Sequence, residues 1–123
     1  MTFQHRELAA GRWKELSFLE QMANVGGEIE RTLNWKRKGN VDYSNRAFER
    51  ALELLDLTID DEKNRSKLKE LVRVREALAD HFAFDNIYRS SDSSWQKYFY
   101  SFAFAAQNNR QHGGNPFRLR ARR

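Results

Sequence analysis

The sequence has no cysteine, a single proline and no long apolar run. The lack of cysteine excludes disulfides, thiolate metal sites and cysteine nucleophiles, and it favours the reducing cytoplasm as the compartment. No stretch reaches the roughly 20 apolar residues that a membrane-spanning helix requires, so we expect no membrane partner. Residues 1–11 carry charges and lack an apolar core, so they do not match a secretory signal. We therefore expect a cytoplasmic protein.

Histidine is also scarce, and the pattern of a cofactor site is missing. The three histidines are His5, His81 and His112, and none is spaced from another as ligands on one helix would be. Gly26-Gly27 is not followed by the Lys-Ser/Thr pair of a phosphate-binding loop. No nucleophile–base pair or carboxylate pair stands out. We therefore expect no metal, no cofactor and no catalytic residue.

The only proline, Pro116, lies beyond the last periodic apolar segment, so the body is free to form helices. The first helix is predicted to begin at a capping box made by Ser17 and Glu20, and to end at Gly39. Its apolar residues recur at the 3- and 4-residue spacing of a core-facing helix. They are Phe18, Met22, Val25, Ile29 and Leu33.

Two further helices are predicted from the same kind of pattern. Asp42 or Ser44 can cap the second helix, and Asp60 or Asp61 can cap the third. The second apolar stripe consists of Phe48, Ala51, Leu52, Leu55 and Ile59. The third consists of Leu68, Leu71, Val72, Leu78 and Phe82.

A loop rich in Asp, Asn and Ser is predicted over residues 84–94, and Ser93 or Ser94 then begins a fourth helix. Its apolar residues are Trp95, Tyr98, Phe99, Phe102, Ala103 and Ala106. Four helices with short connections predict an all-α fold, an antiparallel up-down four-helix bundle with a disordered basic C-terminal tail. The expected boundaries are a lead-in at 1–16, the bundle at 17–109 and the tail at 110–123.

The charge is segregated toward the C-terminus. The tail has five arginines and no carboxylate, and removing them from the 22 cations leaves 17, which balance the 17 carboxylates. Arginine pairs with phosphate and stacks on bases, and Phe117 can stack too. The tail therefore predicts binding to RNA or single-stranded DNA, although a solubilising or partner-docking tail has the same composition. The arginines are Arg110, Arg118, Arg120, Arg122 and Arg123.

A second group of cations, Lys36, Arg37 and Lys38, lies at the predicted C-terminus of the first helix. One interpretation is structural, since cations complement the helix dipole at that end. The other is functional: with Arg31, these cations form a second nucleic-acid-binding patch, which repetition in an oligomer would strengthen.

Some apolar and small residues exceed what one bundle needs. Aromatic residues surround most of the fourth helix, although a helix in a monomeric bundle is apolar on one face. The adjacent glycines Gly26 and Gly27 weaken the first helix, and either a close neighbouring helix or a partner surface can offset that cost. We therefore predict a homo-oligomer interface that includes Gly26, Gly27, Trp95, Tyr100 and Phe104.

Two segments carry a resemblance to a known class. Ala23–Arg31 has small residues within a helix, and Ala47–Leu55 is a helix of Ala, Leu and Glu after a short basic turn. This pattern resembles bacterial four-helix-bundle proteins, which include those encoded in ribosomal RNA intervening sequences and the Avd accessory proteins of diversity-generating retroelements. The resemblance implies a pentameric ring without catalytic residues. Its Avd branch implies a basic ring that binds a reverse transcriptase and its RNA template.

Two other functions fit parts of the sequence. A protein–protein adaptor without nucleic-acid binding would use the tail to dock on a partner. Arg75 and His81 resemble the Arg-x4–6-His signature of HEPN ribonucleases, in which His is the general acid or base and Arg stabilises phosphate in a dimeric cleft. Here Glu76 follows the arginine, where that family commonly has Asn, Asp or His.

Overall fold

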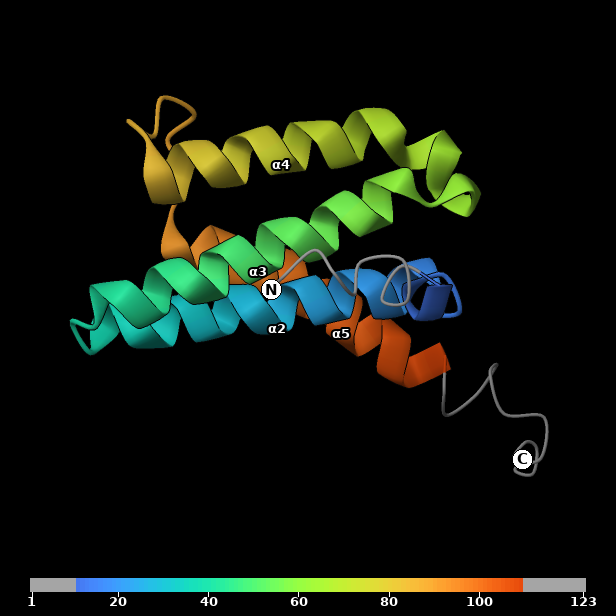
Figure 1. Cartoon of the computed structure of the whole chain (residues 1–123), viewed down its shortest axis with the longest axis horizontal. Helices are drawn as coiled ribbons and strands as arrows, with labels where there is room; N and C mark the ends of the chain where they lie inside the picture. Colours follow the sequence, from blue (N-terminus) through green and yellow to red (C-terminus); the bar gives the residue numbers. More distant parts are fainter. Residues whose placement is uncertain (1–10, 110–123) are drawn as a thin grey trace.

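The computed structural model describes residues 11–109, and every regular element within them is helical, as predicted. The four long helices are α2 (Phe18–Arg37), α3 (Val41–Asp60), α4 (Leu68–Ala83) and α5 (Asp92–Asn108), and a 3-10 helix, η2 (Glu62–Lys67), joins α3 to α4. Consecutive long helices run in opposite directions (Figure 1). The tail arginines, Phe117 and the predicted disorder of residues 110–123 lie outside the described residues.

Both ends of α2 follow the sequence prediction. The Ser17 hydroxyl accepts from the backbone N–H of Glu20 at 3.1 Å, and the Glu20 carboxylate accepts from the N–H of Ser17 at 2.9 Å. This reciprocal pair satisfies two N–H groups that the helix itself leaves without partners. Beyond the last turn, Gly39 adopts φ +78°, a conformation that glycine reaches without steric cost.

The starts of α3 and α5 correct the predicted caps. Asn40, rather than Asp42 or Ser44, caps α3 by accepting from the N–H of Tyr43 at 3.0 Å. Ser91, rather than Ser93 or Ser94, caps α5, which begins at Asp92. Ser91 and Ser94 exchange two hydrogen bonds of 3.1 Å, each from the backbone N–H of one to the hydroxyl of the other. Since several polar residues compete at each boundary, composition alone does not fix which one caps.

Helix α4 corrects the third predicted stripe. Asp61 caps η2 by accepting from the N–H of Lys63, and α4 begins only at Leu68. Leu71 and Leu78 are buried as expected, whereas Leu68 and Val72 are exposed. The face of α4 that enters the core runs through positions 71, 74 and 78. Val72 follows Leu71 by one residue, which is about 100° around the helix and away from the core.

The described part of the predicted lead-in, residues 11–16, packs against the helical body. Trp13 is 8% exposed, belongs to the core and donates from Nε1 to the Thr58 hydroxyl at 3.0 Å. Leu16 also packs against the core. The folded unit therefore begins before the predicted boundary at residue 17.

Helix α2 lies at the centre of the arrangement. It packs along α3 on one side and α5 on the other, while α4 lies beside α3 (Figure 1). The core is made of apolar side chains from all four long helices. Its main members are Met22, Val25, Ile29, Leu33, Phe48, Ala51, Leu55, Leu71, Val74, Leu78, Trp95 and Phe99.

Candidate functional site

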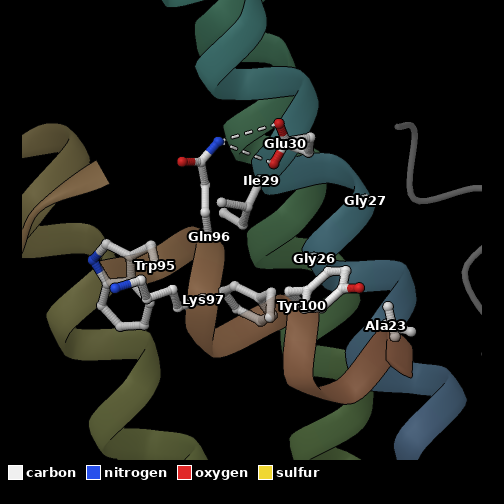
Figure 2. Close-up of a pocket in the computed structure, with 11 residues that line it drawn as sticks. Ala23, Gly26, Gly27, Ile29, Glu30, Trp95, Gln96, Lys97 and Tyr100 are labelled. Carbon is white, nitrogen blue, oxygen red and sulfur yellow. Dashed lines mark hydrogen bonds between the residues drawn. The ribbon is translucent and has the colours of Figure 1, made fainter. Parts of the chain in front are cut away.

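An apolar groove of about 580 Å³ runs between α2 and α5. Small residues of α2 lie along one side, and Tyr100 lies along the other (Figure 2). The Gln96 amide of α5 reaches the Glu30 carboxylate of α2 at 3.3 Å. Four of the five residues predicted to form an oligomer interface line this groove: Gly26, Gly27, Trp95 and Tyr100.

The two adjacent glycines have different surroundings. A Cβ at Gly26 would lie 2.7 Å from the Cβ of Phe99, so glycine here permits α5 to pack closely on α2. A Cβ at Gly27 would meet nothing within 4 Å. The packing of α5 therefore accounts for Gly26, whereas Gly27 opens onto the groove.

The aromatic residues of α5 divide into buried and exposed sets. Trp95 is 8% exposed and packs with Phe99 in the chain's own core, while it also lines the groove. Tyr100 and Phe104 are 69% and 53% exposed, and their rings stack with centroids 6.4 Å apart. The second apolar face of α5 is therefore centred on Tyr100 and Phe104.

The cations at the end of α2 have few acidic partners. Lys36 lies 3.5 Å from Asp92, Arg37 donates to the side chain of Asn34 at 2.7 Å, and the Lys38 ammonium lies 5.1 Å from the centre of the Trp35 ring. Arg37 and Lys38 thus make no ion pair with a described carboxylate. Helix-dipole compensation accounts for part of this arrangement, since Lys36 and Arg37 occupy the last turn.

The charge of this end extends beyond the residues that sequence analysis selected. Residues 31–50, here called the basic hairpin, contain six cations and two carboxylates. Arg46 and Arg50 of α3 face a second groove, of about 350 Å³, together with Arg31 and the aromatic residues Trp35 and Tyr43. Sequence analysis missed Arg46 and Arg50. Their spacing of four residues, which places both on one face of a helix, was the available signal.

The loop between α4 and α5 carries a further apolar surface that sequence analysis did not identify. Phe84, Ile87 and Tyr88 are well exposed. The loop backbone is nevertheless fixed, because the buried Asp80 carboxylate accepts from the N–H groups of Ile87 and Tyr88 at 2.9 and 3.0 Å. Asn86 adopts φ +54° and exchanges two side-chain bonds with the backbone of Ser90.

The two residues of the ribonuclease-like pattern do not come together within the chain. Arg75 forms a two-point ion pair with Asp56 of α3 at 2.6 and 3.2 Å, which raises the pKa of the guanidinium. His81 has a buried side chain, and its Nε2 lies 2.8 Å from Asp92. Six residues on an α-helix correspond to about 240° of rotation, so the two side chains point to different sides of α4.

Asp92 connects α5 to both α4 and α2 through His81 and Lys36. Burial raises the pKa of this carboxyl. Its hydrogen bond with His81 and the charge of Lys36 outweigh that effect, so the pKa lies below its ordinary value. Asp92 therefore links α5 to α4 and to the cationic end of α2.

Residues 11–109 contain no group of three or more His, Asp or Glu side chains placed to hold a metal ion. Among the helices of this range, none has both the length and the apolar character required to cross a bilayer.

Comparisons of the chain with protein-family models, with curated proteins and with solved structures found no match.

Proposed function

We propose that this chain is a non-enzymatic accessory protein that binds RNA or single-stranded DNA as a homo-oligomer of antiparallel four-helix bundles. The observation that carries the proposal is the basic hairpin. Residues 1–109 are neutral overall, yet residues 31–50 have an excess of four cations. Local segregation of positive charge in a neutral body is the electrostatic footprint of a polyanion-binding surface.

The tail adds a second source of attraction to phosphate. Each phosphate that a protein neutralises contributes about 0.7–0.9 to the slope of log affinity against log salt. Five tail arginines would contribute roughly 3.5–4.5 to that slope per chain, and several chains in one assembly would contribute more. With cations in both the basic hairpin and the tail, we expect the affinity for nucleic acid to fall steeply as the ionic strength rises.

The groove between α2 and α5 supports the oligomeric part of the proposal. Gly27, Tyr100 and Phe104 present an exposed apolar surface next to it, and such surfaces commonly mark interaction sites. The resemblance to the Avd proteins adds two more specific expectations, a pentamer and a reverse transcriptase partner.

The test is a salt titration of binding to single-stranded RNA and DNA by the full chain. A variant in which glutamine replaces the five tail arginines should bind more weakly at low salt and show a flatter slope. Its thermal stability should stay nearly unchanged, because arginine side chains are seldom buried in a protein core. Absence of any nucleic-acid binding by the wild type would overturn the proposal.

Light scattering tests the oligomer separately. We expect a mass well above the 14.6 kDa of one chain, and Tyr100→Glu should reduce it by placing a charge beside the groove. A monomer at micromolar concentration would remove the oligomeric part of the proposal while leaving nucleic-acid binding open to its own test.

A protein–protein adaptor is the second candidate function, and the loop between α4 and α5 favours it. Exposed aromatic and aliphatic side chains on a fixed backbone need less ordering on binding, which suits them to anchor a protein partner. Phe84, Ile87 and Tyr88 are exposed, and Asp80 holds the backbone of Ile87 and Tyr88. Absence of nucleic-acid binding by the wild type would place this function ahead, whereas equal affinity and salt slope for the wild type and the tail variant would assign binding to the basic hairpin.

The ribonuclease alternative has its own experiment. His81→Ala should leave RNA as intact as the wild type does, because the His81 side chain is buried against Asp92. Cleavage of RNA by the wild type that His81→Ala abolishes would favour the ribonuclease function instead.

A further inference from the structure

The second groove, between α2 and α3, combines cations with aromatic rings. It is lined by Arg31, Arg46, Arg50, Trp35 and Tyr43, and Glu28 is the one acidic residue of the described range that lines it. Its volume of about 350 Å³ is near the lower end of the range of roughly 300–1,000 Å³ that small-ligand sites occupy. The groove is thus large enough for one small ligand or for one monomer of a polymer.

The rings form a preformed aromatic corner. Trp35 and Tyr43 meet edge to face, with centroids 4.8 Å apart and planes inclined by 85°. Tyr43 is nearly half exposed although its ring contacts Trp35 and the guanidinium of Arg46, so part of the ring is accessible to a ligand. Exposed aromatic faces bind unpaired bases by stacking, whichever base is present.

Among the described residues, Arg31 is the one arginine of this groove that forms an ion pair, although Glu49, Glu53 and Asp56 line a neighbouring groove together with Arg46 and Arg50. Arg31 is held by Glu28 at 2.8 Å, so its charge is partly neutralised. The guanidinium of Arg46 lies 5.6 Å from the centre of the Tyr43 ring, and it makes no ion pair with a described residue. Arg50 lines the same groove without an ion pair to any residue in the range 11–109. Arg46 and Arg50 are therefore available to bind phosphate.

We propose that this groove binds one unpaired nucleotide of a single-stranded nucleic acid. The base stacks on Tyr43 beside Trp35, and Arg46 and Arg50 hold the adjoining phosphates. The inference rests on the proposed function and adds to it the site and the preference for unpaired strands. That preference follows because the bases of a duplex are stacked on one another and cannot reach the Tyr43 ring.

An acidic peptide is the competing occupant, since carboxylates also pair with arginine. The aromatic corner favours the nucleotide, because a stacked base gains from the ring face whereas a carboxylate does not. The effect of altering Tyr43 without changing charge therefore separates the two.

The experiment measures binding of the full chain to a labelled 12-nucleotide single-stranded RNA and to the corresponding duplex. The variants are Tyr43→Leu, Tyr43→Phe and the pair Arg46→Gln with Arg50→Gln. The matched charge control replaces Arg65 and Arg73 with glutamine, since both are exposed arginines outside the groove. Urea unfolding of each variant confirms that it remains folded.

We expect Tyr43→Leu to weaken single-strand binding by about 5- to 160-fold, the range for losing one stacked base. Tyr43→Phe should bind like the wild type, and duplex binding should change little with either. The Arg46/Arg50 pair should weaken binding more than the Arg65/Arg73 control at equal net charge.

Two outcomes overturn the inference while leaving the proposed function intact. One is single-strand binding by the wild type that Tyr43→Leu does not weaken. The other is equal weakening by the two arginine pairs, which would indicate attraction to net charge alone. If the wild type binds no nucleic acid at all, the proposed function fails first. If an acidic peptide then binds the wild type and Tyr43→Leu with equal affinity, the groove is a site for a protein partner.

Discussion

Where α3 passes into η2, polar side chains are buried and bonded to one another, whereas the cations near the α2–α3 turn are exposed and have few partners. At the first end, Gln21 donates to the Trp13 carbonyl and to Asp61 at 3.0 and 2.8 Å. Asn64 donates to Gln21 and to the Thr58 carbonyl at 2.8 and 2.9 Å. We call these five residues the polar cluster: Trp13, Gln21, Thr58, Asp61 and Asn64. The other end is the basic hairpin, where Arg46 and Arg50 make no ion pair with a described residue.

The difference separates stability from binding. A buried, mutually bonded network loses a great deal when one member is removed, because its partners remain buried without hydrogen bonds. Exposed cations contribute little to stability, and their solvated charge stays available for a ligand. We therefore expect substitutions at the polar cluster to change unfolding, and substitutions at the basic hairpin to change binding.

The largest expected effect comes from Gln21→Ala. The change removes three hydrogen bonds, leaves Asn64 and Asp61 with missing partners and opens a cavity, so it should lower the free energy of unfolding by about 3 kcal/mol. Urea denaturation followed by circular dichroism measures it. The matched control is Gln96→Ala on α5, whose bonds to Glu30 are exposed and long, and which should cost less than about 0.5 kcal/mol. Similar losses for both would contradict the comparison.

Two alanine substitutions in the middle of α2 test whether the loss of stability depends on close packing at the substituted residue or on its position along the helix. Gly26→Ala puts a Cβ against Phe99 and should destabilise the protein by about 1–2 kcal/mol, even after the gain in helix propensity. Gly27→Ala meets open space and should stabilise it by up to about 1 kcal/mol. Thermal melts of the pair give the difference, and equal shifts would mean that α5 does not pack closely at Gly26.

Lowering the pH should destabilise the protein by protonating Asp61 in the polar cluster and Asp92 beside the basic hairpin. The effect of Asp61 should be the larger of the two. Burial raises the pKa of Asp61, but hydrogen bonds from Lys63 and Gln21 and the Lys63 charge outweigh it, so this pKa is lowered, as is that of Asp92. A lowered folded-state pKa contributes stability above the unfolded value, about 3.9 for Asp, and this stability is lost as the pH falls through the folded value.

We therefore expect the wild type to lose stability below about pH 4. Asp61→Asn should flatten this acid limb more than Asp92→Asn, because Asp61 is buried and Asp92 is partly exposed. Urea midpoints between pH 2.5 and pH 7 test the order, and a steeper limb in Asp61→Asn would contradict it.

The smallest effect on stability is expected at the basic hairpin. Replacing Arg46 and Arg50 with glutamine should change the free energy of unfolding by less than about 0.5 kcal/mol, because both side chains are exposed and have no ion pair to lose. The same urea experiment measures it. A loss above about 1 kcal/mol would show that these arginines support the fold, and would weaken the contrast between the two ends.

The predictable part of the fold is the part that obeys binary patterning. Met22, Val25, Ile29 and Leu33 are buried as their spacing indicates, because α2 is regular and flanked by helices on two sides. Gln21 is equally buried but polar, so no hydrophobic pattern includes it. Its burial depends on partners up to 43 residues away, such as Asn64, and local sequence carries no record of that pairing.

The candidate sites follow the same division. Gly27, Tyr100 and the cations from Arg31 to Lys38 were identifiable as local anomalies of composition. Arg46 and Arg50 were not, because their four-residue spacing indicates only a shared face of a helix, and arginine is ordinary on an exposed face. Their significance arises only where α3 turns back along α2 and brings them to Trp35.

The three tryptophans occupy three distinct environments, and this gives the protein built-in optical reporters. Trp13 lies in the polar cluster, Trp95 in the core under α5, and Trp35 in the α2–α3 groove. With phenylalanine at two of these positions, the emission of the third would report on its own region alone. Trp35 emission would follow the occupancy of the groove, and Trp13 emission would follow the opening of the other end. Because the chain has no cysteine, a single introduced thiol could carry an acceptor dye and turn either signal into a distance.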